Sequence, residues 1–239
     1  VRNPQNIVVT NIKDNIDFIP FAVNGISQNA VRNLKEWLEI MKNKYDFIIV
    51  DSNPSLQSPE LVRESDYWIA PTELTTVSIN SLNNTIEYVG LDKLFAIVPN
   101  KKRTTINHKE GEEYLKTQYL EELKELGKDD VIVTDSIKLS TEFESLLFDS
   151  KTVTELIEKS NNNHSELNYI FFNLSENLIA KMSKENNKDY KIDKNYILRN
   201  KELIMKNQKM EHLSEFQEKY NLDDITYNSK MLRNKEEQE

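Results

Sequence analysis

An aspartate stands directly after an unbroken apolar run in the first quarter of the chain. Residues 47–50 are Phe, Ile, Ile and Val, and Asp51 follows them. A continuous run of this kind predicts a strand that is covered on both faces of a parallel sheet. Asp51 would then lie at the carboxyl end of that strand, where open α/β sheets bind ligands and where carboxylates commonly hold metal ions. The alternative is an aspartate that caps the next helix.

Other apolar runs of strand length come before and after this segment. They lie at residues 7–12, 16–20, 67–71, 94–100 and 131–133. Apolar residues at helical spacing fill most of the intervening sequence. The predicted helices begin after Ser27, cover 60–64, run from Ser78 to near Gly90, cover 107–126 up to Gly127, and begin again at Thr152. Strand and helix thus alternate between residues 45 and 159, which predicts an α/β fold with a doubly wound, mostly parallel sheet.

The character of the sequence changes after the sheet region. We expect residues 1–159 to form the sheet domain and residues 160–183 to form a packing helix, with an apolar stripe between 165 and 182. Residues 184–239 are rich in Lys, Asn and Glu and are predicted to be a charged helical tail, with helical patterning from 196 to 220. The prediction is therefore a sheet domain with a C-terminal helical extension.

Composition excludes several classes of site. The chain of 239 residues has no cysteine and only three histidines, so disulfides and thiolate metal sites are excluded. It has no apolar run near the roughly 20 residues that span a bilayer and no signal peptide, which makes a cytoplasmic protein the simplest interpretation. Basic and acidic residues balance in 184–239, so the whole net charge of −9 lies in residues 1–183. DNA binding would therefore need a local basic patch.

The order of these segments resembles the ParA/Soj and MinD group of deviant-Walker P-loop ATPases. Residues 45–56, YDFIIVDSNPSL, are similar to the family's Walker B and switch II segment, with Asn53 in place of its first Pro. Residues 66–71 resemble the strand that follows it, and residues 94–105 the next strand and its Arg-Thr loop. The segments IKLS at 137–140 and KTV at 151–153 complete the ordered match. The resemblance implies a sheet of the P-loop NTPase type.

One departure concerns the phosphate-binding loop of the family. The four glycines of this chain stand alone, so no glycine-rich loop can converge on phosphates here. The family's P-loop and its switch I Asp would lie upstream, and we expect the natural protein to continue in that direction. The expected sheet lacks its P-loop strand, which would leave residues 47–50 with an exposed apolar edge. The chain itself then carries no catalytic residue. The alternative is a degenerate relative whose sheet closes differently.

The resemblance also implies roles for individual residues. Asp51 would hold Mg²⁺ through a water molecule, and Pro54 and Ser55 would sense the γ-phosphate of ATP. Asn100 would hydrogen-bond the adenine edge, unless it is an ordinary strand-to-loop asparagine. Thr134 takes the place of the family's adenine-side Pro, which leaves that base contact open.

Four basic residues are candidates for contacts with DNA phosphates. They are Lys101, Lys102, Arg103 and Lys138, which lie in predicted rim loops. Such contacts would make binding salt-dependent. Their alternative role is a solvated charge cluster, because Glu110, Glu112 and Glu113 are close in sequence.

Two functions are consistent with these features. The first is a ParA-like partition ATPase at the bacterial nucleoid, which dimerises with ATP, binds DNA non-specifically and is stimulated by a ParB-like activator. The second is a non-catalytic adaptor that keeps the sheet as a scaffold and uses the tail from Lys184 onward for binding. Membrane targeting of the MinD kind is disfavoured because the chain ends KEEQE, without a basic amphipathic helix.

Overall fold

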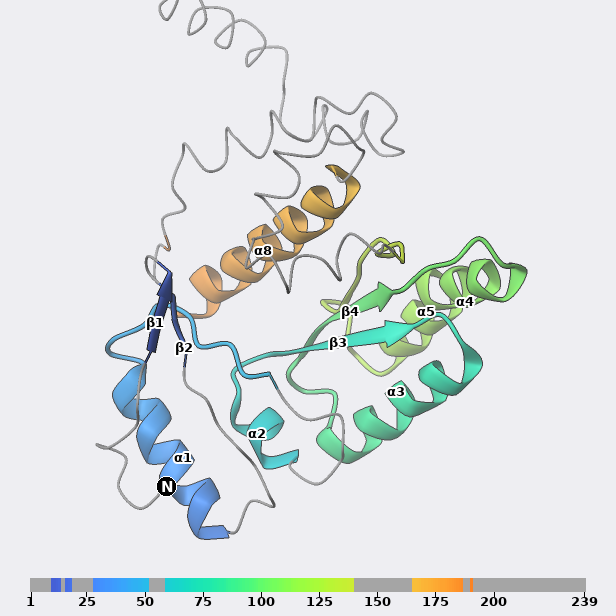
Figure 1. Ribbon diagram of the computed structural model, residues 1–239. Coiled ribbons are helices and arrows are strands. Elements are labelled where there is room, and N and C mark those ends of the chain that lie inside the picture. The colour runs from blue at the N-terminus through green and yellow to red at the C-terminus, as the bar shows by residue number, and fades with distance from the viewer. Residues whose placement is uncertain are drawn as a thin grey trace, which may run out of the picture. The chain divides into compact units, whose positions relative to one another are not determined.

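The computed structural model describes residues 10–13, 16–18, 28–51, 59–139, 165–186 and 190 (Figure 1). The chain divides into two compact units, Val1–Ser136 and Ile137–Glu239. The predicted helix from Thr152 and the predicted helical patterning at 196–220 lie outside the described residues. The helix predicted at 165–182 is confirmed as α8 (Ser165–Asn186) in the second unit.

A hairpin and two helices form the first part of the first unit. Strands β1 (Thr10–Lys13) and β2 (Ile16–Phe18) pair antiparallel, which confirms the two predicted strands. Lys13, predicted as part of the turn, belongs to β1, and the rest of the predicted turn lies outside the described residues. Helix α1 (Gln28–Met41) follows where the helical spacing predicted it, and α2 (Pro59–Glu64) confirms the predicted short helix. An ion pair of 2.7 Å between Lys35 and Glu64 joins the two helices.

A parallel sheet of three described strands forms the centre of this unit. Strands β3 (Trp68–Glu73), β4 (Leu94–Asn100) and β5 (Ile132–Val133) are adjacent in that order. The alternation of strand and helix therefore predicted the α/β class and the parallel pairing correctly. Side chains of β4 are buried along most of the strand, whereas those of β3 alternate between buried and exposed.

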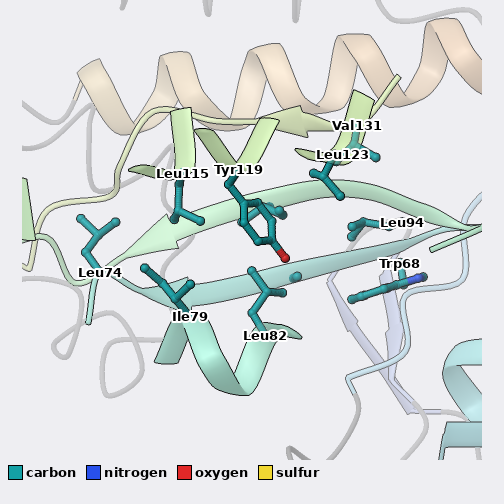
Figure 2. Packing of buried hydrophobic residues seen from close by; sticks show 11 residues of the cluster. Trp68, Leu74, Ile79, Leu82, Leu94, Leu115, Tyr119, Leu123 and Val131 are labelled. Carbon is teal, nitrogen blue, oxygen red and sulfur yellow. The ribbon is translucent and has the colours of Figure 1, made fainter. Parts of the chain in front are cut away.

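Helices α3 (Thr76–Val89), α4 (Ile106–Lys116) and α5 (Gln118–Glu125) contribute to one apolar cluster against β3 and β4. Figure 2 shows Ile79 and Leu82 of α3 facing Leu115 and Tyr119 of α4 and α5. Right-handed crossovers between strands that advance in one direction place their helices on the same face of the sheet. The described helices of this cluster therefore do not establish the two-sided covering of a doubly wound sheet.

Local hydrogen bonds explain two differences from the predicted helix bounds. Helix α3 begins two residues before Ser78 because the Thr75 side chain accepts a hydrogen bond from the Ser78 N–H, at 3.2 Å. The single helix predicted at 107–126 is two helices that meet at Thr117. The Thr117 hydroxyl donates to the Glu113 carbonyl at 2.7 Å, a bond that competes with the helical pattern and bends helices.

The predicted strand at residues 47–50 is wrong for this structure. These residues form no strand, and Phe47, Ile49 and Val50 are exposed, Ile49 to 93%. A continuous apolar run forms a buried strand only when neighbouring strands and covering helices enclose it. None of the described strands pairs with this segment. The exposed strand edge that we expected here is therefore also wrong, because the apolar side chains are exposed on a segment that is not a strand.

Gly111 sets the distance between α4 and the end of β3. An ideal Cβ at this position would lie 2.8 Å from the Leu74 carbonyl oxygen, closer than real Cβ contacts come. Leu74 itself is fully buried, so its backbone has little room to move. The isolated glycine inside a helix therefore has a packing role, since glycine otherwise weakens a helix.

We predict that Gly111→Ala lowers the free energy of unfolding by about 1–3 kcal/mol, because the added methyl group overpacks the contact with Leu74. Helix propensity alone predicts the opposite sign, a gain of about 1 kcal/mol. Urea unfolding followed by circular dichroism measures the difference. Lys109→Ala, at an exposed position of the same helix, is the control. Equal or higher stability of Gly111→Ala would contradict the close approach.

Candidate functional site

Two predicted nucleotide-binding residues lie at the carboxyl ends of adjacent strands. Asn100 ends β4, and Thr134 follows β5 and donates its backbone N–H to the Ile97 carbonyl at 3.0 Å. The Asn100 side-chain oxygen accepts the Lys101 N–H at 2.7 Å and supports the positive φ of 53° at Lys101. The Asn100 amide NH₂ has no partner among the described residues, so a hydrogen-bond donor remains free at this rim.

Asp51 does not join these two residues at the sheet rim. It is exposed and follows the non-strand segment 47–50, and Pro54 and Ser55 lie outside the described residues. The described part of the chain contains no group of three or more His, Asp or Glu side chains that could hold a metal ion. A single carboxylate suits only the kind of Mg²⁺ site in which water and substrate phosphates complete the coordination.

A cluster of ion pairs covers the rim beside β5, and we call it the rim ion-pair cluster. It consists of Lys102, Glu112, Lys116, Asp135 and Ser136. Glu112 accepts from Lys102 at 2.5 Å and from the Ser136 hydroxyl at 2.6 Å, while Lys116 lies 2.6 Å from Asp135 and 3.7 Å from Glu112. These contacts connect α4 to the loops that follow β4 and β5.

Opposing effects set the pKa of two members of this cluster. Burial acts to raise the pKa of the Glu112 carboxyl, but hydrogen bonds from Lys102 and Ser136 and the nearby lysine charges lower it overall. Burial likewise acts to lower the pKa of Lys116, while Asp135 and then Glu112 raise it overall. Both groups are therefore held in their charged forms.

The predicted DNA contacts are not brought together as one free basic patch. Lys101 lies 2.6 Å from Glu73, and Lys102 belongs to the rim ion-pair cluster. Lys138 is in the second unit, and it has an interaction within the described chain. The Arg103 guanidinium makes no hydrogen bond or ion pair with the described residues, although its charge helps to lower the pKa of Glu73 after the larger effect of Lys101.

A pocket of about 870 Å³ opens beside this rim, between the first turns of α3 and α4. Figure 1 shows both helices starting beyond the carboxyl ends of β3 and β4. Arg103, His108, Asn83 and Glu110 are polar residues of its lining. Sequence analysis did not identify His108 or Asn83, because a single histidine or asparagine inside a helical pattern carries no spacing signal.

Comparisons with protein-family models, with curated proteins and with solved structures found no match to this chain. The structure therefore defines the class of the protein by itself: an α/β protein with a three-stranded parallel sheet in its described part. No helix of the described residues is long and apolar enough to cross a membrane.

We predict that Glu112→Gln lowers the free energy of unfolding by about 1–3 kcal/mol near neutral pH, because it leaves Lys102 without its carboxylate partner and leaves Lys116 with Asp135 alone. The native pKa of Glu112 is below its ordinary value of 4.5, so its contribution is present above that pH. It is lost as the pH falls through the lower native pKa. The stability difference between wild type and variant should thus shrink below about pH 4.5.

Urea unfolding at about pH 6.5 and about pH 3.5 tests this pH dependence. Glu87→Gln, on the exposed surface of α3, is the matched control and should change stability by less than about 0.5 kcal/mol at both pH values. A difference for Glu112→Gln that is the same at both pH values would rule out a role for its charge.

Proposed function

We propose that this chain belongs to a ParA-like partition ATPase, which dimerises with ATP on non-specific DNA and releases it when a ParB-like activator stimulates hydrolysis. The main support is the position of Asn100 and Thr134 at the carboxyl ends of neighbouring parallel strands. Ligands of open α/β sheets bind at this edge. Among the possible ligands we favour ATP, because the order of the segments along the sequence resembles that of the ParA/Soj and MinD ATPases.

Each predicted residue has a definite task in this proposal. The free NH₂ group of Asn100 can donate to an acceptor on the adenine edge, and the Thr134 backbone closes the rim beside it. Asp51 would orient a water ligand of Mg²⁺, whose charge neutralises the phosphates of ATP. The exposed segment 47–50 would have to pair within a sheet to bring Asp51 to the rim. This chain has no glycine-rich loop, so its own residues would contribute the adenine and metal contacts of the site.

We predict that the natural full-length protein binds a fluorescent ATP analogue saturably with Mg²⁺, and that Asp51→Asn weakens binding at least about tenfold. The reason is the loss of the carboxylate that positions the metal and its water. Fluorescence anisotropy measures the dissociation constant. Asp92→Asn is the matched control, since Asp92 is 97% exposed and precedes β4 at the opposite edge of the sheet.

The outcome separates two candidate functions. Saturable binding that depends on Asp51 but not on Asp92 supports the ATPase. Absence of binding by the full-length protein would overturn it and favour the non-catalytic adaptor. Two observations favour that second candidate: the 47–50 segment is outside the sheet, and Lys101 and Lys102 are already paired with carboxylates.

The DNA-binding step makes a separate prediction about salt. Lys101 and Lys102 would have to exchange Glu73 and Glu112 for phosphates, and the exposed Lys138 would have to exchange its interaction within the described chain. We predict that Lys138→Gln reduces the slope of log affinity against log salt concentration by about 0.9, the value for one phosphate contact. DNA binding by the ATP-bound protein at several salt concentrations measures the slope. Lys124→Gln, at an exposed position of α5, should leave the slope unchanged.

A further inference from the structure

Several residues that line the pocket between α3 and α4 carry hydrogen-bond donors with no partner in the part of the chain that the structure describes. His108 is only 8% exposed, and its Nδ1 accepts the Arg103 backbone N–H at 3.3 Å. In the neutral ring the proton is therefore on Nε2, which has no partner among the described residues. Asn83 uses its side-chain oxygen to accept the Tyr119 hydroxyl at 2.7 Å, which leaves its NH₂ group as a donor.

A positive charge and two helix dipoles act on the same pocket. Arg103 lines it, and its guanidinium, which has no partner among the described residues, can form two parallel hydrogen bonds to a planar anion. Helices α3 and α4 both begin at the pocket, and Thr105 makes no capping side-chain hydrogen bond at the start of α4. Helix N-termini favour negative charge. The donors, the cation and the dipoles thus all favour an anionic ligand.

The rest of the lining restricts the charge and shape of that anion. Glu110 also lines this pocket, and its negative charge opposes a doubly charged group such as phosphate. Leu74, Ile79 and the Tyr114 ring provide apolar wall, and Val77 at the mouth is 76% exposed. A volume of about 870 Å³ is within the range of small-molecule sites.

We propose that this pocket binds the carboxylate of a small organic acid with an apolar or aromatic body. Arg103 and the Nε2–H of His108 hold the carboxylate, the Asn83 amide donates a further hydrogen bond, and the apolar wall contacts the body of the ligand. Asp51, Asn100 and Thr134 do not line the pocket, so this site is separate from the proposed nucleotide site. It also gives Arg103 a role other than contact with DNA.

The test uses the full chain and the probe 4-fluorophenylacetate, followed by fluorine NMR. The neutral analogue 4-fluorophenylacetamide has nearly the same shape without the charge. We expect saturable binding of the acid and at least about tenfold weaker binding of the amide, because charge-assisted hydrogen bonds are lost. Arg103→Gln should weaken binding of the acid at least about tenfold for the same reason.

Two further variants test whether binding depends on charge inside the pocket. Lys109→Gln removes an exposed positive charge of α4 outside the pocket and should leave binding unchanged. Val77→Glu places a carboxylate at the mouth on an exposed position, so the fold should persist while binding of the acid is weakened. Thermal unfolding confirms the fold of each variant.

Three results would each overturn the proposal. The first is equal affinity for the acid and the amide, and the second is no effect of Arg103→Gln. The third is displacement of the probe by inorganic phosphate at lower concentrations than by unlabelled phenylacetate, which would make this a phosphate site. Failure of the protein to bind the ATP analogue would not affect the carboxylate-binding result, because the two measurements use different probes and different variants.

Discussion

The packing of β4 is the constraint on which the rest of the described sheet depends. This strand pairs in parallel with β3 on one side and β5 on the other, and its apolar side chains are almost completely buried. Parallel strands need long crossover connections, and here α3 and the α4–α5 pair supply them. Because both connections return over the same cluster, the starts of α3 and α4 are fixed near each other beside the strand ends.

This arrangement gives the sheet rim two electrostatically different parts. Beside β5, Glu112 and Lys116 connect α4 to the neighbouring loops by charge-assisted hydrogen bonds, and their charges are mutually satisfied. Beside α3, the Arg103 guanidinium has no ion-pair partner in the described chain, and His108 offers a buried donor. A satisfied network stabilises the fold, whereas unpaired donors in a pocket are available to a ligand.

The exposed segment 47–50 leaves the proposed nucleotide site incomplete in this structure. A nucleotide site of the proposed type needs Asp51 at the same rim as Asn100, and the described strands do not provide that position. Burial of an apolar side chain such as Ile49 contributes about 1.5–3 kcal/mol, so pairing of this segment within a sheet would be favourable. The pocket between α3 and α4 is formed entirely by residues outside that segment.

Local patterns in the sequence were enough to locate several helices and strands. Apolar runs located β3 and β4, helical spacing located α1, α3 and α8, and their alternation predicted the parallel pairing. The conformation of residues 47–50 could not be predicted in this way, because an apolar run forms a strand only if neighbouring strands exist to pair with it. The same holds for the pairing of Lys102 with Glu112 and for the presence of Arg103 and Asn83 in the lining of one pocket, since spatial neighbours on different elements leave no spacing pattern in the sequence.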